Sequence, residues 1–301
     1  MSLRQMAKGR LKHLLYDACY HFRVRMLPPS QAKKKLAILY LYAERDRYPG
    51  SLAGVLKLAK HFRGLDLTCV SIDNLHGDKE AKLIRDRCFD IGGDNRFWEF
   101  SGWHKGVQFL RKQRIDPDWV LFVNDAFLNG ASEGYDLSFY TSRLNSLLVS
   151  RLSPLGELAV GVTYRWPEYH EFLGHDVSSW IRSNLFLLSY AVVVKLKLAF
   201  LSEAQIDAIL PAASRGELFL GGAQLNPEFK AFLEKWMTER WYGAAKPCPE
   251  NWARMRAKIV SILNERMLTV QLQRLGVRIV NLAKVYPSQV CCGSVKDIVL
   301  T

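Results

Sequence analysis

The stretch of residues 116–130, DPDWVLFVNDAFLNG, combines a buried strand with an abrupt polar end. Its centre, residues 119–123, consists of aromatic, β-branched and aliphatic side chains, which are typical of a strand covered on both faces. The strand stops at Asn124 and Asp125, an amide beside a carboxylate, and a loop with a glycine follows. This pattern predicts a central strand that brings two polar side chains to the edge of a sheet.

Strand and helix patterns alternate on both sides of this stretch. Apolar runs at 36–43, 65–73, 157–165 and 183–189 predict further strands. Helix patterns lie between them at 51–62, 78–88, 99–113 and 135–152. Ser51 is the expected N-cap of the first of these helices. This alternation favours an α/β fold, in which a mostly parallel sheet forms the middle of three layers.

The C-terminal third is predicted to be more helical. Helix patterns at 202–212, 226–237 and 250–276 precede a short strand at 277–282, and Gly276 is suited to end the last helix. Residues 180–201 are apolar but contain Arg182, Lys195 and Lys197, so they predict a strand followed by a helix rather than a membrane span. No flexible linker is visible, and we expect residues 36–301 to form a single domain.

The chain is basic, with 42 Lys and Arg against 29 Asp and Glu in 301 residues and a net charge of +13. Such a charge favours anionic partners. The basic residues are dispersed, and no helix-turn-helix, RRM or zinc-finger signature is present, which disfavours nucleic acid as the partner. The glycine motifs of Rossmann and P-loop proteins and the GxSxG motif of hydrolases are also missing.

Residues 1–35 form a distinct basic segment. Its apolar residues recur at helical spacing, at Leu11, Leu14, Leu15, Ala18 and Phe22. Such an amphipathic segment can lie on an anionic membrane surface, or it can pack on the domain that follows. Six scattered cysteines without CxxC spacing indicate reduced thiols. We therefore expect a cytoplasmic protein, with residues 1–30 as a candidate contact with the inner membrane.

Polar residues gather where the predicted strands end. They are Tyr42, Glu44, Arg45 and Asp46, then Asp73, Asn74 and His76, then Asn124 and Asp125, and finally Tyr164, Arg165 and Trp166. Ligands of open α/β sheets bind beyond the carboxyl ends of the strands. The joint placement of these residues predicts a binding site at this edge, although each one alone fits an ordinary loop.

One longer segment carries a family resemblance. Residues 92–130 contain Asn95, the pair Glu99-Phe100, Trp103, Gly106 and the pair Asn124-Asp125 in this order. In this arrangement the segment resembles the core of the rhamnan synthesis F-like glycosyltransferases of bacterial polysaccharide assembly. Residues 182–189 and 264–279 look like later elements of that family, so the resemblance spans roughly residues 36–282. The chain departs from the family pattern with Glu99 in place of Asp and Ala126 in place of Ser.

The resemblance implies a GT-A-like fold with a nucleotide-sugar as substrate. The sugar donor would bind the half at about 36–165, and the acceptor would meet the half at about 166–301. The candidate donor-binding residues are Tyr42, Glu44, Asp73, Asp94, Asn95, Glu99, Trp103, Asn124 and Asp125. For two of them a structural role is the alternative: Glu99 suits the N-terminus of a helix, and Trp103 could simply pack in the core.

Transfer of a sugar requires stabilisation of the departing diphosphate, by a divalent cation or by Lys and Arg. Asp125 is the candidate ligand for Mg²⁺ or Mn²⁺, but it lies beside Asn124 rather than a second carboxylate, so direct contact of the pair with the sugar donor stays open. An inverting enzyme also needs a base for the acceptor hydroxyl. Glu265 and Asp176 are the candidates, with Glu171 nearby in sequence. Glu265 falls in the apolar register of a long helix, which indicates a cleft, while a solvated helix face is the alternative.

The sequence thus predicts a glycosyltransferase of bacterial surface polysaccharide synthesis, such as that of the lipopolysaccharide O-antigen. It would move a sugar, with rhamnose as one candidate, from a nucleotide-sugar to a lipid-linked or oligosaccharide acceptor. The alternative is a non-catalytic scaffold or polysaccharide-binding protein with a glycosyltransferase-like fold. The missing second carboxylate beside Asp125 supports that alternative.

Overall fold

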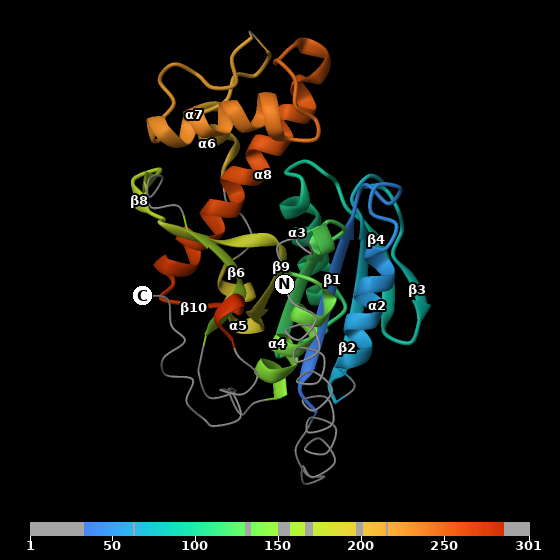
Figure 1. The fold of residues 1–301 in the computed structure, drawn as a ribbon. Helices are drawn as coiled ribbons and strands as arrows, with labels where there is room; N and C mark the ends of the chain where they lie inside the picture. The colour runs from blue at the N-terminus through green and yellow to red at the C-terminus, as the bar shows by residue number, and fades with distance from the viewer. Residues whose placement is uncertain are drawn as a thin grey trace, which may run out of the picture.

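A mixed sheet with the strand order β10-β6-β9-β5-β1-β2-β4-β3 forms the middle of the protein (Figure 1). This computed structural model describes residues 33–62, 64–129, 134–149, 157–165, 171–196, 201–214 and 216–285. The strands are β1 (Lys35–Tyr42), β2 (Asp66–Asp73), β3 (Lys82–Arg85), β4 (Cys88–Gly92), β5 (Trp119–Asn124), β6 (Leu158–Arg165), β9 (Ser179–Ser189) and β10 (Arg278–Asn281). A separate hairpin consists of β7 (Glu171–Phe172) and β8 (His175–Asp176).

Among the described strands of the main sheet, four of the seven pairs are parallel. β1 pairs in parallel with β2 and β5, β2 with β4, and β6 with β10. β9 is the exception inside the sheet, because it runs antiparallel to both of its neighbours, β5 and β6. β3 is antiparallel to β4 and forms one edge. The carboxyl ends of the parallel strands therefore meet the amino-terminal end of β9.

Helices cover both faces of the sheet. Their bounds are α2 (Ser51–His61), α3 (Glu99–Lys112), α4 (Leu137–Val149), α5 (Tyr190–Leu196), α6 (Glu203–Asp207), α7 (Pro227–Lys235) and α8 (Pro249–Arg274), with a π-helical turn at Trp236–Arg240 and a 3₁₀ turn at Leu282–Lys284. One core joins α2 and α4 to one face of the strands, and a second core joins α3, α5 and α8 to the other face. The predicted three-layer α/β fold with a more helical C-terminal part is confirmed.

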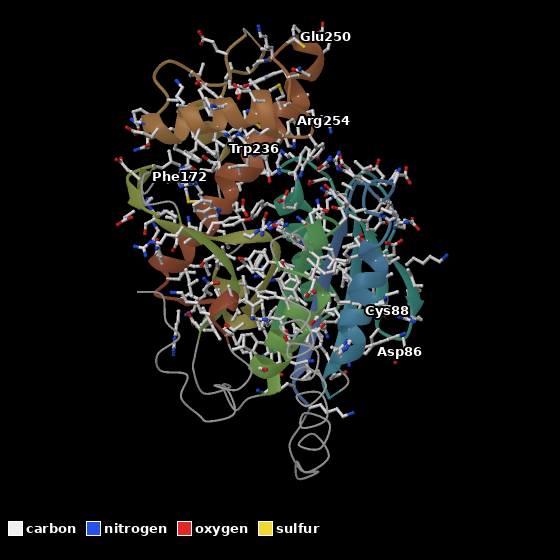
Figure 2. All side chains as sticks on the ribbon, in the orientation of Figure 1. Asp86, Cys88, Phe172, Trp236, Glu250 and Arg254 are labelled. Carbon is white, nitrogen blue, oxygen red and sulfur yellow. The ribbon has the colours of Figure 1, made fainter. Side chains whose placement is uncertain are left out.

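The two cores follow from the alternation of side chains along each strand. In β1, Leu36 and Ile38 face the core under α2, while Leu39 and Leu41 face the core under α3. Both faces are buried, which explains why the strand reads as a continuous apolar run. Above the sheet, α6 and α7 lie beyond the carboxyl ends of the strands (Figure 1), and Trp236 and Arg254 belong to this helical part (Figure 2).

Two local predictions are wrong. Residues 78–88 do not form a helix, since β3 and the start of β4 occupy them. The second correction concerns Ser51, which is the first residue of α2 and does not cap it. Gly50 is the N-cap, and the Ser51 hydroxyl instead lies 2.6 Å from the Tyr40 hydroxyl in a buried hydrogen bond.

The prediction of a strand followed by a helix at 180–201 is confirmed by β9 and α5. Gly276 follows α8 with a φ of 66°, as expected for a residue that ends a helix in the left-handed conformation. None of the helices in the described ranges has the length and apolar character needed to span a membrane. The described residues begin at position 33, so positions 1–32 of the predicted amphipathic segment lie outside them.

Candidate functional site

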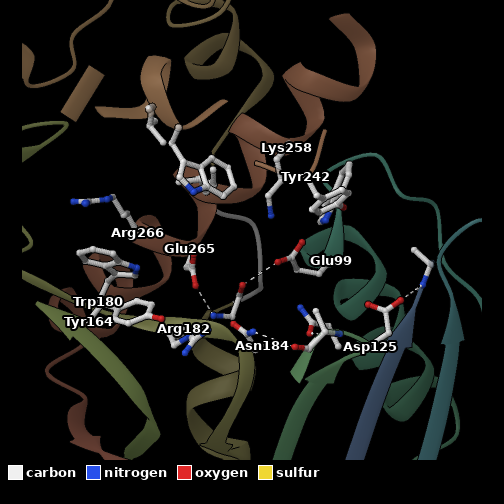
Figure 3. A pocket seen from close by; sticks show the side chains of 18 of the residues that line it. Glu99, Asp125, Tyr164, Trp180, Arg182, Asn184, Tyr242, Lys258, Glu265 and Arg266 are labelled. Atoms are coloured by element: carbon white, nitrogen blue, oxygen red, sulfur yellow. Dashed lines mark hydrogen bonds between the residues drawn. The ribbon is translucent and has the colours of Figure 1, made fainter. Parts of the chain in front are cut away.

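A cavity of about 570 Å³ lies at the carboxyl edge of the sheet, between the strand ends and the helices α7 and α8 (Figure 3). The ends of β1 and β5, the start of β9 and the N-terminus of α3 supply its polar wall. Aromatic side chains of the helical part supply much of the opposite wall. Concave sites of this size with a few convergent polar groups are typical of small-molecule binding.

The cavity brings together several of the residues predicted from sequence. Those that line it are Glu44, Glu99, Asn124, Asp125 and Glu265. The remaining candidates lie outside its lining, namely Tyr42, Asp73, Asp94, Asn95, Trp103 and Asp176. Residues from opposite ends of the chain thus meet at one place, as the rule for open α/β sheets predicts.

Asp125 directly follows β5 and holds the loop after β1. Its Oδ2 atom accepts hydrogen bonds from the backbone amides of Ala43 at 2.8 Å and Glu44 at 2.9 Å. Burial raises the pKa of the Asp125 carboxyl, and the two amide hydrogen bonds oppose this rise only in part. Asn124, beside it, accepts a hydrogen bond from the amide of Ala126 at 3.1 Å. The pair therefore shapes two loops at the cavity wall as well as facing the cavity.

Glu99 and Glu265 are connected through Ser183. The Ser183 hydroxyl donates to Glu99 Oε1 at 2.9 Å, while the Ser183 amide donates to Glu265 Oε1 at 2.5 Å. The Ser261 hydroxyl donates to the second oxygen of Glu99, also at 2.9 Å. Both oxygens of Glu99 are thus engaged, whereas Oε2 of Glu265 accepts no hydrogen bond from the described residues. Glu265 is left with one oxygen for a ligand.

Burial is the main cause of a raised pKa at Glu265, and the negative charge of Glu99 adds to it. The Ser183 amide and the positive charges of Lys258 and Arg182 oppose the rise without cancelling it. A carboxylate whose pKa lies above its usual range is a stronger base than an exposed one. The position of Glu265 on the cavity wall favours the cleft that its apolar register predicted.

Three cations line the cavity: Arg182 from β9, and Lys258 and Arg266 from α8. Arg182 lies over the ring of Tyr164, with 4.6 Å between the guanidinium carbon and the ring centroid. The Lys258 ammonium lies 5.5 Å from the Trp98 ring centroid. Arg266 is stacked between Trp180 and Phe229, and burial lowers its pKa to about 10. Figure 3 shows Lys258 extending between Glu99 and Glu265.

The wall formed by the helical part is aromatic. Phe232 of α7 and Trp236, the first residue of the π-helical turn, are four residues apart and both line the cavity. Trp236 stacks on Trp241 at a centroid distance of 6.3 Å, and the amide of Trp241 donates to the carbonyl of Trp236 across the π-helical turn. π-Helical turns are rare and often occur at functional sites. Flat aromatic faces of this kind suit nucleobases and sugar rings.

Glu44 lines the cavity and connects its two walls. Its carboxylate accepts a hydrogen bond from the Tyr242 hydroxyl at 3.3 Å and pairs with Arg254 at 3.6 Å. Burial raises the pKa of Tyr242 to about 12, and the nearby charge of Glu44 adds to the rise. Arg47 covers the Tyr242 ring at 3.4 Å. These contacts join the loop after β1 to the chain between α7 and α8.

Tyr42 and Asp73 belong to a second polar cluster, which lies beside the cavity and not in it. Lys79 contacts the Tyr42 hydroxyl and Asp73 at 3.3 Å each, and it pairs with Asp90 at 2.6 Å. Burial raises the pKa of Tyr42 to about 12. Burial also acts to raise the pKa of Asp73, but hydrogen bonds from His76, Tyr42 and Lys79 outweigh it and lower the pKa. Lys79 thus binds both carboxylates of the cluster.

Asn95 has a structural partner in Asn74. The Asn74 amide group donates to Asn95 Oδ1 and to the carbonyl of Trp98, each at 2.9 Å. Asn95 and Trp98 have φ values of 51° and 56°, a conformation that costs energy for side chains other than glycine. Asn74 therefore fixes the loop that leads to Glu99. Asp94 lies exposed on the same loop.

Trp103 and Asp176 are also placed away from the cavity. Trp103 is 1% exposed and packs edge-on against Phe100, Phe122 and Phe186, so its ring fills the core beneath the site. Asp176 lies exposed on β8, opposite Glu171 on β7. Of the two candidate bases, only Glu265 faces the cavity.

The residues around Asp125 do not by themselves fit a divalent cation. Mg²⁺ and Mn²⁺ prefer several oxygen ligands in a fixed geometry. Oδ2 of Asp125 is occupied by two amides, and within the described ranges no three His, Cys, Asp or Glu side chains gather as a metal site would need. We therefore assign no step to a metal.

Several cavity residues were not predicted from sequence: Arg182, Ser183, Asn184, Lys258, Arg266 and Trp236. The signal for the first three is the polar triplet ahead of the apolar run at 185–188. For Lys258 it is the spacing to Ile262 and Glu265, since positions four and seven apart share one face of a helix.

Comparison with known proteins gives little beyond this geometry. No protein-family model matches the chain, and no curated protein matches it. Among solved structures, the mannosyltransferase PcManGT from Pyrobaculum calidifontis, in complex with GDP-Man and Mn²⁺, is similar over 94% of this chain and 88% of its own. The two sequences are 11% identical, and the TM-score is 0.34. A likeness of this size carries no argument about activity, and the resemblance to the rhamnan synthesis F-like family stays a prediction.

Proposed function

We propose that this protein is a glycosyltransferase that transfers a sugar from a nucleotide-sugar to a hydroxyl group of an acceptor, within a GT-A-like fold. The observation that carries the proposal is the cavity at the carboxyl edge of the sheet, where the Glu99–Ser183–Glu265 chain faces cations and aromatic rings. Aromatic faces suit a base or a sugar ring, and cations suit a diphosphate. The sequence resemblance points to the same class of reaction.

Glu265 is the base in this mechanism. Its Oε2 takes the proton of the acceptor hydroxyl while the acceptor oxygen bonds to the anomeric carbon of the sugar. The bond between that carbon and the phosphate oxygen breaks, and its electron pair leaves on the nucleoside diphosphate. Ser183 holds Glu265 through its amide and Glu99 through its hydroxyl, so it orients both carboxylates. Direct displacement of this kind inverts the anomeric centre.

The acceptor is proposed to enter from the helical side. Phe232 and Trp236 line that side, and Glu265 lies between it and the strand ends. A lipid-linked saccharide or an oligosaccharide fits this arrangement, and bacterial surface polysaccharide synthesis is the setting that the resemblance suggests. Rhamnose is the first sugar to test as the transferred group.

Thermal denaturation with UDP, GDP, CDP and dTDP and their sugar conjugates tests the proposal. A ligand at 100 times its Kd stabilises the folded protein by about 2.7 kcal/mol, which gives a measurable rise in Tm. We expect one base to raise the Tm, and its sugar conjugate to be consumed when acceptor is present. No stabilisation by any of these compounds would refute the proposal. Binding without consumption would support the non-catalytic alternative.

A further inference from the structure

We propose that the cavity holds the diphosphate of its substrate with the side chains of Lys258 and Arg182, without a divalent cation between protein and phosphate. This inference rests on the proposed function, since it concerns the same nucleotide-sugar. It goes further by naming the groups that meet the departing charge.

Lys258 faces the cavity without an opposite charge in contact. It shares one face of α8 with Ile262 and Glu265, all three of which line the cavity. Its ammonium lies over the Trp98 ring at 5.5 Å and forms no ion pair with any residue that the structure describes. A cation–π contact leaves the N–H groups of an ammonium available for an anion. Lys258 is therefore suited to a phosphate oxygen.

Arg182 provides a second cation, from β9 on the sheet side of the cavity. It lies near the start of β9, next to Ser183, and its guanidinium is stacked on Tyr164. Stacking on a ring holds the guanidinium plane, whose edge can bind two phosphate oxygens at once. Lys258 from α8 and Arg182 from β9 thus approach the cavity from the helical part and from the sheet.

The carboxylates of the cavity are occupied by protein donors. Glu99 accepts one serine hydroxyl on each oxygen, at 2.9 Å each. Asp125 accepts two amides on Oδ2, and Glu265 accepts the Ser183 amide. Glu44 pairs through Oε1 with Arg254 and through Oε2 with Arg47 at 3.8 Å. One oxygen each of Asp125, Glu265 and Glu44 accepts no hydrogen bond from the described residues, and that of Glu44 faces Arg47, whereas Mg²⁺ and Mn²⁺ are held by convergent sets of oxygens. The ligand chemistry thus favours side-chain cations as the partners of the phosphates.

Side-chain cations in fixed positions can stabilise a developing negative charge as a metal ion does. The bond to the anomeric carbon breaks with a build-up of negative charge on the diphosphate, and cations placed in advance stabilise that charge. Charges inside a concave site are screened less by water than charges on the open surface, so each such contact is stronger there. A charge-assisted hydrogen bond contributes about 1.5 to 3 kcal/mol, which corresponds to about 10-fold to 150-fold in affinity.

Isothermal titration with the nucleoside diphosphate that gives the largest rise in Tm tests this inference. The wild-type protein is titrated in excess EDTA and again in excess MnCl₂, followed by Lys258→Met, Arg182→Gln and a matched control, Lys235→Met. Lys235 is an exposed lysine of α7 outside the cavity lining, so its removal changes the net charge equally. Melting of the unliganded variants checks that each is folded.

We expect the same affinity in EDTA and in MnCl₂, a loss of about tenfold or more in Lys258→Met and Arg182→Gln, and no loss in Lys235→Met. Retained affinity in Lys258→Arg would support a purely electrostatic role. Binding that requires MnCl₂ would overturn the inference and leave the proposed function standing. Equal affinity of Lys258→Met and Lys235→Met would also overturn it. Failure of all four diphosphates under both conditions would refute the proposed function itself.

Discussion

Replacing Glu265 by Gln should stop turnover and at the same time make the protein more stable at neutral pH. The substitution keeps an oxygen that can accept the Ser183 amide, which donates to Glu265 at 2.5 Å. It removes the carboxylate that would take the acceptor proton, and general bases contribute about 10² to 10⁴ in rate. We therefore expect kcat to fall by about this factor, with little change in nucleotide affinity.

The stability gain follows from the raised pKa of Glu265. An exposed Glu in the unfolded chain has a pKa of about 4.3. Between that value and the higher folded pKa the unfolded chain loses its proton first, so the free energy of unfolding falls as pH rises through this window. At a pH above this window, each unit of difference between the folded and unfolded pKa lowers the free energy of unfolding by about 1.4 kcal/mol relative to its value below the window. Gln does not titrate and avoids this loss.

Thermal melting from pH 4 to pH 8 measures this effect, with Glu239→Gln, an exposed carboxylate, as the control. We expect the Tm of Glu265→Gln to exceed that of the wild type at neutral pH, by about 2 °C for each kcal/mol in a chain of this size. The difference should shrink as the pH falls toward 4. A variant that melts below the wild type at every pH, or that turns over at the wild-type rate, would refute the reasoning.

Four further predictions follow from the described contacts. Trp103→Ala should lower the free energy of unfolding by about 3 to 5 kcal/mol in urea titrations, because the ring is 1% exposed, and a negligible change would contradict its place in the core. Asn74→Ala removes the hydrogen bonds to Asn95 and Trp98, so it should lower the free energy of unfolding by about 1 to 3 kcal/mol and speed amide hydrogen exchange at 93–98. Unchanged exchange would argue against this role of Asn74. Asp125→Asn keeps an oxygen for the amides of Ala43 and Glu44, so the variant should fold normally. We expect its kcat to fall by at least about tenfold, which is about 1.4 kcal/mol in activation free energy. Wild-type turnover would remove Asp125 from the site. Deletion of residues 1–30 should reduce sedimentation with anionic vesicles, and equal sedimentation would remove this segment as a membrane contact.

The elements that could be predicted are those in which local pattern and tertiary packing agree. β1 and β5 are apolar on both faces, and α3 places its apolar residues on one side, so their signals are strong. The segment 78–88 is rich in helix-forming Lys, Glu and Arg, which led to the wrong helix. Cys88 instead lies opposite Cys69 in the parallel ladder between β4 and β2. Arg87, just before it, turns the chain with a φ of 50°. Pairing with the neighbouring strands β4 and β2 overrode local propensity there.

Individual site residues were harder to predict, since the side on which a polar residue lies depends on its neighbours in space. Asp73 is the last residue of β2 and Asp125 directly follows β5, in the same sheet. Asp125 reaches the cavity because β5 lies next to β9 and opposite α8, whereas Asp73 meets Lys79 from its own loop. Both carboxylates lie at the end of a strand, and the order of the strands decides which of them reaches the cavity.

The direction of β9 explains why Arg182, Ser183 and Asn184 were not predicted. In a parallel sheet the residues after each strand form the ligand-binding edge, so a sequence pattern indicates those positions and not the start of a strand. β9 pairs antiparallel to β5, with Leu185 opposite Val123, so the chain before Leu185 lies beside Asn124 and Asp125. Arg182, Ser183 and Asn184 reach the cavity from the beginning of a strand.

This reversal has a chemical consequence. A strand that arrives at the edge with its amino-terminal end can point its backbone N–H groups and its first side chains at the site, and Ser183 uses both, through its amide to Glu265 and its hydroxyl to Glu99. Ser183→Ala would keep the amide contact and lose the hydroxyl contact. If Ser183 serves mainly to place Glu265, Ser183→Ala should retain most of the activity. If Glu99 must also be held, kcat should fall toward that of a Glu99→Gln variant. The pair of variants therefore separates the two carboxylates by experiment.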